Sequence, residues 1–215
     1  MSYIGIIGAG RLDKADSSLF LLEAKEKAVS LLQNGIGMDK AKRMTGWETG
    51  VDGKWRYEVD DPFHTTAEIE DYMKRHYGES IDIRFCMKNT LLLTAYPEFE
   101  RLRLFCRYTP ADKFMGYFDP KRYGMVVCMG TAGSPFKYQT EGVLLHEVQH
   151  LIQEAEGFAR GGDAKRGRGR YLRLAGEVEA RNVCARHFLS LEQRLSTLRT
   201  ETQDVPDGEQ IVTWR

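Results

Sequence analysis

The chain lacks most features that would indicate an extracellular, membrane-spanning or polyanion-binding protein. Its 4 cysteines lie far apart without a C-x-x-C pair, so we predict neither a disulfide framework nor a zinc ribbon. Its 31 basic and 31 acidic side chains cancel, which argues against a general nucleic-acid-binding surface. No apolar run approaches the length of a membrane span, and residues 1–10 lack a basic signal-peptide region. These absences favour a soluble, cytoplasmic protein.

Histidine is also scarce, yet two of the 5 histidines form one motif, His146-Glu147-Val148-Gln149-His150. Histidines at i and i+4 on a helix project from one face, so both imidazoles can reach a single tetrahedral Zn²⁺. The glutamate between them can act as general base toward a water that the metal activates. The motif therefore predicts a zinc hydrolase, with His146 and His150 as ligands and Glu147 as the catalytic base.

The residues around this motif predict a helix with a buried side and a ligand side. Apolar residues recur at i, i+4, i+7 and i+8, namely Leu144, Val148, Leu151 and Ile152. Val148 lies about 200° around the helix from His146, so the histidines should face a cleft and not the core. Gly157 is a plausible stop, and we predict a helix over residues 140–157.

A catalytic zinc site needs a third protein ligand. The metzincin pattern is excluded because it requires glycine and histidine where the chain has Gln153 and Glu156. Two glutamates on a second predicted helix, over residues 171–197, can supply the ligand. Glu177 projects near the apolar stripe of that helix, whereas Glu179 projects almost opposite it, so we choose Glu179 and leave Glu177 as the alternative. His187 is a weaker candidate.

Other segments complete an α+β fold. We predict one domain, 1–215, with an accessory, mostly helical half (1–80) and a catalytic half (81–215). Helices are expected over residues 17–33, 38–44 and 65–76, and strands over 54–59, 102–107, 114–118 and 124–129. The glycines of Gly8-Ala9-Gly10 resemble a dinucleotide-binding turn, but Asp13 occupies the position that requires a small residue. The basic loop over residues 159–170 could bind anions, although such a run is more often a solvated loop.

The chain resembles the zincin-like metallopeptidase domains found in polyvalent proteins of bacteriophages and other mobile elements. The residues that carry the resemblance include Thr45-Gly46-Trp47, Asp52-Gly53-Lys54-Trp55-Arg56, Ala95-Tyr96-Pro97, Leu145-His146-Glu147-Val148-Gln149-His150, Glu156-Gly157-Phe158-Ala159, Gly161-Gly162 and Gly176-Glu177 with Glu179-Ala180-Arg181-Asn182-Val183. The resemblance implies an intracellular peptidase-like module of a longer protein. It also implies a zincin-like fold, in which a small antiparallel or mixed sheet packs on the H-E-x-x-H helix and on a second long, ligand-bearing helix.

We therefore expect a zinc-dependent metallopeptidase of gluzincin type, with Zn²⁺ held by His146, His150 and Glu179. Its expected partner is a protein or peptide substrate, and neither a membrane nor nucleic acid is expected. The donor that polarises the substrate carbonyl is left open among Tyr138, Tyr171 and Arg181. The alternative is a metal-stabilised, non-catalytic module of a mobile element that binds a protein or nucleic acid. That alternative would require a fourth protein ligand on the metal.

Overall fold

The computed structural model describes residues 6–8, 19–59, 71–72, 75–76, 79–85, 91–108, 116–119, 124–129 and 140–214. The predicted helix over 65–76 lies largely outside these residues, as do Tyr138 and most of the glycine turn after Gly8. The described α-helices are α1 (Leu19–Gln33), α2 (Met38–Thr45), α4 (Leu91–Ala95), α5 (Thr140–Glu156), α6 (Arg168–Arg173), α7 (Ala175–Arg186) and α8 (Leu191–Ser196). Short 3₁₀ helices are η3 (Ile83–Phe85), η4 (Pro97–Arg101), η6 (Ala164–Arg166), η7 (Arg199–Glu201) and η8 (Asp207–Glu209).

The strands form two separate sheets, which confirms the α+β class. β1 (Ile6–Gly8), β3 (Trp55–Glu58) and β2 (Trp47–Thr49) form an antiparallel sheet in the order β1-β3-β2. The second sheet has the order β4-β5-β7-β6, with strands Ser80–Asp82, Arg103–Tyr108, Gly124–Met129 and Gly116–Asp119. Its central pair, β5 and β7, is parallel and its outer pairs are antiparallel, so this sheet is mixed.

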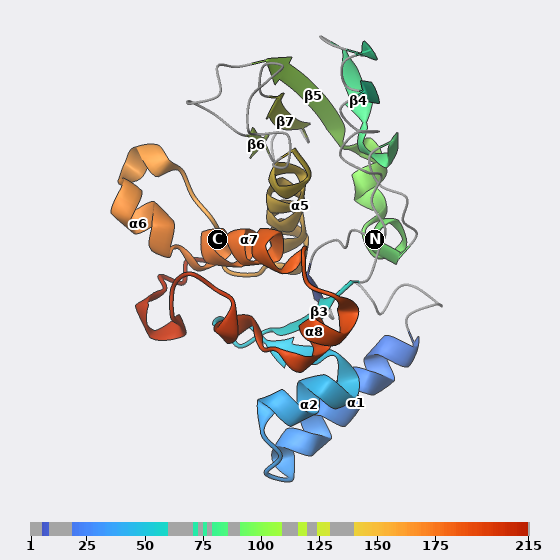
Figure 1. The fold of residues 1–215 in the computed structure, drawn as a ribbon, viewed down its shortest axis with the longest axis vertical. Coiled ribbons are helices and arrows are strands. Elements are labelled where there is room, and N and C mark those ends of the chain that lie inside the picture. Colours follow the sequence, from blue (N-terminus) through green and yellow to red (C-terminus); the bar gives the residue numbers. More distant parts are fainter. Residues whose placement is uncertain are drawn as a thin grey trace.

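Helix α5 connects these parts, as Figure 1 shows. One end of α5 lies at the mixed sheet, and α7 crosses near its other end. The sheet β1-β3-β2, called the N-terminal sheet below, lies beyond α7 and above α1 and α2. The apolar stripe predicted for α5 is buried, since Leu144, Val148, Leu151 and Ile152 are at most 2 % exposed. The helix ends at Gly157, whose φ of 63° allows the Phe158 amide to donate to the carbonyl of Gln153 at 2.9 Å. The prediction for this helix is therefore confirmed to within one residue.

The predicted long helix over 171–197 is wrong, because the chain forms α6, α7 and α8 there instead. Between α6 and α7, Leu174 forms a β-bridge with Ile211 near the C-terminus. The Ile211 amide donates to the carbonyl of Arg173, and the Ile211 carbonyl accepts from the amide of Ala175. Because these backbone groups of residues 173 and 175 bond to Ile211, they are not available for bonds within one continuous helix. Between α7 and α8, Ser190 caps the new helix by a capping box with Gln193.

Charged side chains buried between α2, β3 and α7 hold the N-terminal sheet to the rest of the chain. Arg186 of α7 forms a bidentate ion pair with Glu58 of β3, in which both N–O distances are 2.7 Å. Lys42 of α2 bonds to Glu48 and to the carbonyl of Thr197. Because an unpaired charge in this position would be strongly destabilising, these pairs fix how the elements pack. No helix among the described residues is both long and apolar enough to cross a bilayer.

Candidate metal centre

Two histidines of α5 and one glutamate of α7 converge on a single point. The Nε2 atoms of His146 and His150 are 3.1 Å apart. Each lies 3.4 Å from one oxygen of Glu177, Oε2 for His146 and Oε1 for His150. Ligands on a tetrahedral Zn²⁺ at about 2.0–2.1 Å are separated by about 3.3–3.4 Å. The three side chains therefore have the spacing that a shared zinc ion requires.

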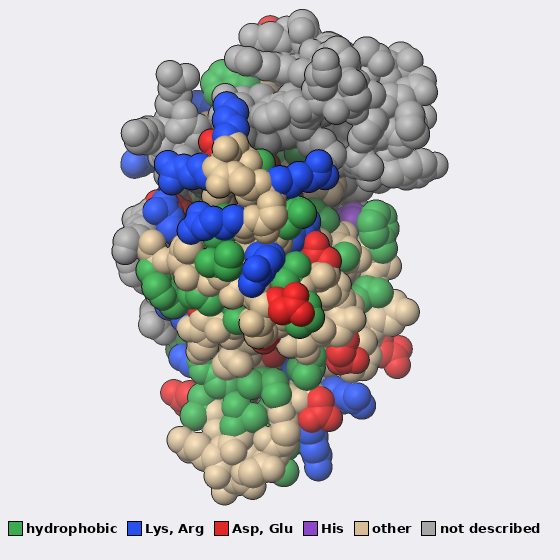
Figure 2. Space-filling view, turned by 90° about the vertical axis from the view of Figure 1, so that its left-hand side faces the viewer, with side chains coloured by type: hydrophobic (Ala, Val, Ile, Leu, Met, Phe, Trp, Pro, Cys, Tyr) green, Lys and Arg blue, Asp and Glu red, His purple; other side chains and the backbone are tan. Residues whose placement is uncertain are grey.

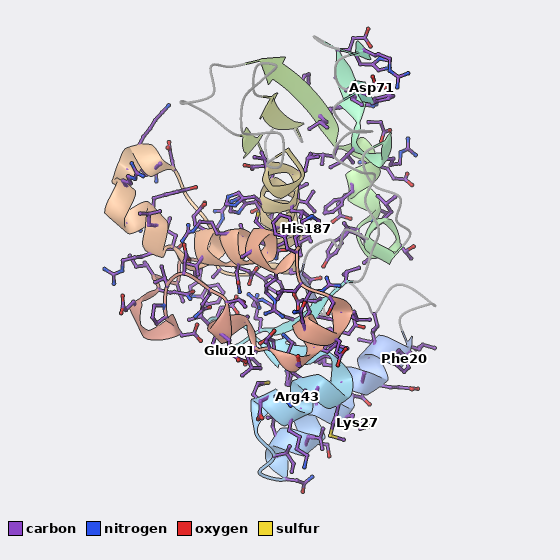
Figure 3. The ribbon with its side chains drawn as sticks, in the orientation of Figure 1. Phe20, Lys27, Arg43, Asp71, His187 and Glu201 are labelled. Atoms are coloured by element: carbon purple, nitrogen blue, oxygen red, sulfur yellow. The ribbon has the colours of Figure 1, made fainter. Side chains whose placement is uncertain are left out.

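The structure shows which glutamate of α7 lies beside the histidines. The structure brings Glu177, and not Glu179, to the histidine pair. Both oxygens of Glu179 are already used, because Oε2 accepts from Arg56 at 2.9 Å and Oε1 accepts from Gln149 at 2.8 Å. His187 follows α7 directly and is labelled in Figure 3; ten residues of helical rise, about 15 Å, separate it from Glu177.

Glu179 is expected beside the histidines only if residues 171–197 form one helix, and they form three shorter ones. Phe188 and Leu191 belong to the apolar stripe of that predicted helix, but they lie beyond the end of α7 and are 75 % and 41 % exposed. The buried side of the real helix includes Val178, Ala180 and Val183, together with Glu177 at 2 % exposure. The side of α7 that carries Glu177 thus faces α5 and is enclosed, whereas we expected the ligand-bearing side to face an open cleft.

Two glycines allow this close packing. A Cβ atom at Gly161 would lie 2.3 Å from Oε1 of Glu177 and 2.7 Å from the ring of His150. A Cβ atom at Gly176 would lie 2.3 Å from the backbone nitrogen of Gly161. The loop after α5 can therefore press against the start of α7, where the amide of Gly162 donates to Oε1 of Glu177 at 2.9 Å.

One buried oxygen indicates that the group of residues fits a cation. Oε2 of Glu177 is enclosed and accepts no hydrogen bond of ordinary geometry from the described residues. A buried carboxylate oxygen without a partner costs free energy unless a cation satisfies it. A divalent ion between the three side chains would supply that partner, and imidazole with carboxylate is a donor set that zinc accepts.

The electrostatic environment of the three side chains also favours a positive charge between them. Burial alone would raise the pKa of Glu177, but the two imidazoles and the Tyr171 hydroxyl outweigh it and lower this pKa. Burial lowers the pKa of His146, and His150 and Arg181 add to that effect. For His150, burial is outweighed by Glu177 and Glu147, which raise its pKa to about 9. A metal ion would replace the proton that His150 otherwise carries.

The remaining predicted residues lie around this point. Glu147 is 5 % exposed and its charge acts on His150, in keeping with a position beside the histidine pair. Tyr171 of α6 lies near Glu177, because burial together with this carboxylate raises the pKa of its hydroxyl. Arg181 pairs with Asp204, but its Nη1 is buried and donates no hydrogen bond to any residue that the structure describes.

The basic loop lies on the surface beside the site. Lys165, Arg166, Arg168 and Arg170 are exposed, and among the described residues none of them has an acidic partner. Figure 2 shows basic side chains gathered on the face that contains α6. The only acidic residue of the loop, Asp163, accepts a hydrogen bond from the amide of Lys165. The loop is thus a solvated, positively charged surface.

Comparison with known families agrees with part of the resemblance. Residues 5–66 match the family described as large polyvalent protein associated domain 23. The match supports an association of this chain with large polyvalent proteins. It ends before α5 and therefore carries no information about a metallopeptidase domain. No curated protein matches the chain, and no solved structure matches it.

Proposed function

We propose that the chain is a zinc-dependent metallopeptidase with a zincin-like site, in which His146, His150 and Glu177 hold the metal. The convergence of these three side chains supports the proposal most directly. Bound zinc would polarise a substrate carbonyl and acidify a water molecule. Glu147, the neighbour of His146, would accept the proton of that water and then pass it to the leaving amine.

Of the two described donors considered for the substrate carbonyl, Arg181 is the better supported. Burial and the nearby Glu177 raise the pKa of the Tyr171 hydroxyl, and this carboxylate competes with a substrate for its hydrogen. Nη1 of Arg181 is buried, has no acceptor among the described residues, and is close enough to His146 to lower its pKa. A buried N–H without a partner can donate to an oxygen on which negative charge develops. We therefore assign this role to Arg181.

The alternative function remains a metal-stabilised, non-catalytic binding module of a mobile element. Its physical basis is Tyr171, since a phenolic oxygen beside Glu177 could complete the metal coordination. The presence of a polyvalent-protein-associated segment is compatible with either function. The coordination sphere separates them: three protein ligands and a water favour hydrolysis, whereas four protein ligands favour a structural role.

The experiment is a metal assay combined with a cleavage assay on the whole chain. Protein grown with zinc should carry about one Zn²⁺ per chain and should cleave an unfolded protein such as reduced casein. Glu147→Gln should keep the zinc and lose cleavage, because it removes the base and leaves the ligands. Protein without stoichiometric zinc would refute the proposal. A zinc-loaded chain with a fourth protein ligand and no cleavage would establish the alternative.

A further inference from the structure

We propose that Arg56 and Glu179 are positioning residues of the metal centre, which hold His150 through Gln153. The N-terminal sheet lies within the segment that matches the polyvalent-protein family, and through Arg56 it would then help to position a metal-binding histidine. This inference rests on the proposed function, because it requires that the histidine pair bind a metal.

The first contact joins Gln153 to a metal-binding histidine. Nδ1 of His150 lies 2.8 Å from Oε1 of Gln153. The amide nitrogen of Gln153 donates to the carbonyl of Gly176 at 2.8 Å and to Oε1 of Glu179 at 3.1 Å. A carbonyl and a carboxylate can only accept, so the orientation of the Gln153 amide is determined. His150 must therefore carry hydrogen on Nδ1 and present the lone pair of Nε2 to the metal.

The second contact joins Glu179 to the N-terminal sheet. Nε of Arg56 donates to Oε2 of Glu179 at 2.9 Å, and the Arg56 side chain is only 3 % exposed. Arg56 is itself fixed, since Nη2 donates to Asp52 at 2.8 Å and Nη1 donates to the carbonyl of Lys54 at 2.9 Å. Its guanidinium carbon also lies 3.4 Å from the ring centroid of Phe158. Strand β3 thus presents one rigid, charged donor to Glu179.

These contacts form a continuous series from strand β3 to the metal ligand. Arg56 orients the carboxylate of Glu179, the carboxylate orients the amide of Gln153, and the amide oxygen orients His150. Metal-binding histidines commonly donate their second N–H to such a partner, and loss of that partner weakens metal binding. Here the partner is a neutral amide, which the charged pair behind it polarises.

A nearby ion pair shows what purely structural support would look like. Glu58 lies two residues after Arg56 on β3 and binds Arg186 of α7 at 2.7 Å. This pair joins the same strand to the same helix and is similarly buried, and within the described part of the chain neither side chain hydrogen-bonds to His146, His150 or Glu177. Glu58→Gln is therefore a matched control for the loss of a β3–α7 charge pair.

The test measures the zinc affinity of folded, full-length variants by competition with a chromophoric chelator. Gln153→Met, Arg56→Met and Glu179→Gln should each bind zinc about 10-fold to 100-fold more weakly than wild type. Glu58→Gln should lower the unfolding midpoint and leave zinc affinity unchanged. The double variant Arg56→Met with Gln153→Met should bind no more weakly than Gln153→Met alone, because both changes interrupt one series.

Three results would overturn the inference: wild-type affinity in Arg56→Met, an equal loss in Glu58→Gln, or additive losses in the double variant. A wild-type chain that binds no zinc would instead refute the proposed function. If Arg56→Met does not fold, long-range ¹H–¹⁵N NMR of wild-type protein with Zn²⁺ gives an independent test. His150 should then show hydrogen on Nδ1 and metal on Nε2, and the opposite tautomer would overturn the inference.

Discussion

Gly161 lies directly against Glu177, so closely that any side chain at position 161 would occupy the space of the carboxylate. A Cβ atom there would be 2.3 Å from Oε1 of Glu177, far inside normal contact distance. Gly161 belongs to the loop after α5, and Glu177 lies in the first turn of α7. The loop therefore sets the position of the carboxylate relative to the histidines of α5.

The first prediction follows from this contact. Gly161→Ala should displace Glu177 or the loop and lower zinc content well below one ion per chain, measured by elemental analysis after gel filtration. Gly169→Ala is the matched control, because a Cβ atom at position 169 meets nothing within 4 Å. Gly169 lies in α6, where alanine is favoured by about 1 kcal/mol, so this variant should keep its zinc and should not unfold more easily. Equal zinc content in both variants would contradict the role of Gly161.

The second prediction separates the two glutamates of α7. Glu177→Gln removes a proposed ligand and should abolish stoichiometric zinc binding, because two histidines alone hold zinc poorly. Glu179→Gln leaves all three ligands in place and should still bind one zinc when the metal is in excess, although more weakly. Isothermal titration with Zn²⁺ distinguishes these outcomes. The reverse order of loss would restore Glu179 as the ligand.

The sequence was sufficient for those parts of the fold that depend on local pattern. The period of Leu144, Val148 and Leu151 predicts α5 and its buried side, and both are present. The strands over 102–107 and 124–129 are also found, as β5 and β7, because short segments dominated by apolar residues are a local signal. The histidine pair needs only a helix to be brought together.

The remaining features of the fold and of the candidate site depend on contacts between segments that are distant in the sequence. The break before α7 is made by Ile211, which pairs with Leu174 and has no local signature there. By contrast, the Ser190–Gln193 capping box could have indicated the start of α8. The contact of Arg56 with Glu179 spans 123 positions, and a single sequence offers no pattern for it. The choice between Glu177 and Glu179 required the true ends of α7.

The third prediction concerns the donor to the substrate carbonyl. Arg181→Met should lower kcat by about 100-fold and change KM little, because the donor acts mainly as charge develops on the oxygen. Zinc content should stay at the wild-type level, since Arg181 is not a ligand. Arg173→Met is the control, because Arg173 is exposed and binds the backbone carbonyl of Glu209. Steady-state kinetics on a fluorogenic peptide would show the difference, and an equal effect of both changes would remove Arg181 from this role.

The last prediction concerns stability at acidic pH. Burial alone would raise the pKa of Glu58, but Arg186 and Lys42 outweigh it and lower the pKa below its usual 4.5. Because the folded-state pKa is the lower one, the ionised carboxylate stabilises the fold fully above about pH 4.5. This contribution is lost progressively as the pH falls below 4.5 toward the folded-state pKa. Urea unfolding at a series of pH values should therefore show a falling free energy of unfolding over this range.

Glu58→Gln provides the control for that measurement. The variant cannot ionise at position 58, so its free energy of unfolding should be lower at pH 7 and should fall less steeply between pH 5 and pH 3 than that of wild type. Removal of one partner from a buried ion pair costs about 3–5 kcal/mol, and the amide should reduce this cost because it still accepts a hydrogen bond from Arg186. Parallel curves for the two proteins across this range would show that Glu58 does not carry the acid sensitivity. Other carboxylates whose pKa is lowered in the folded protein, such as Asp52 beside Arg56, would then cause the loss of stability in acid.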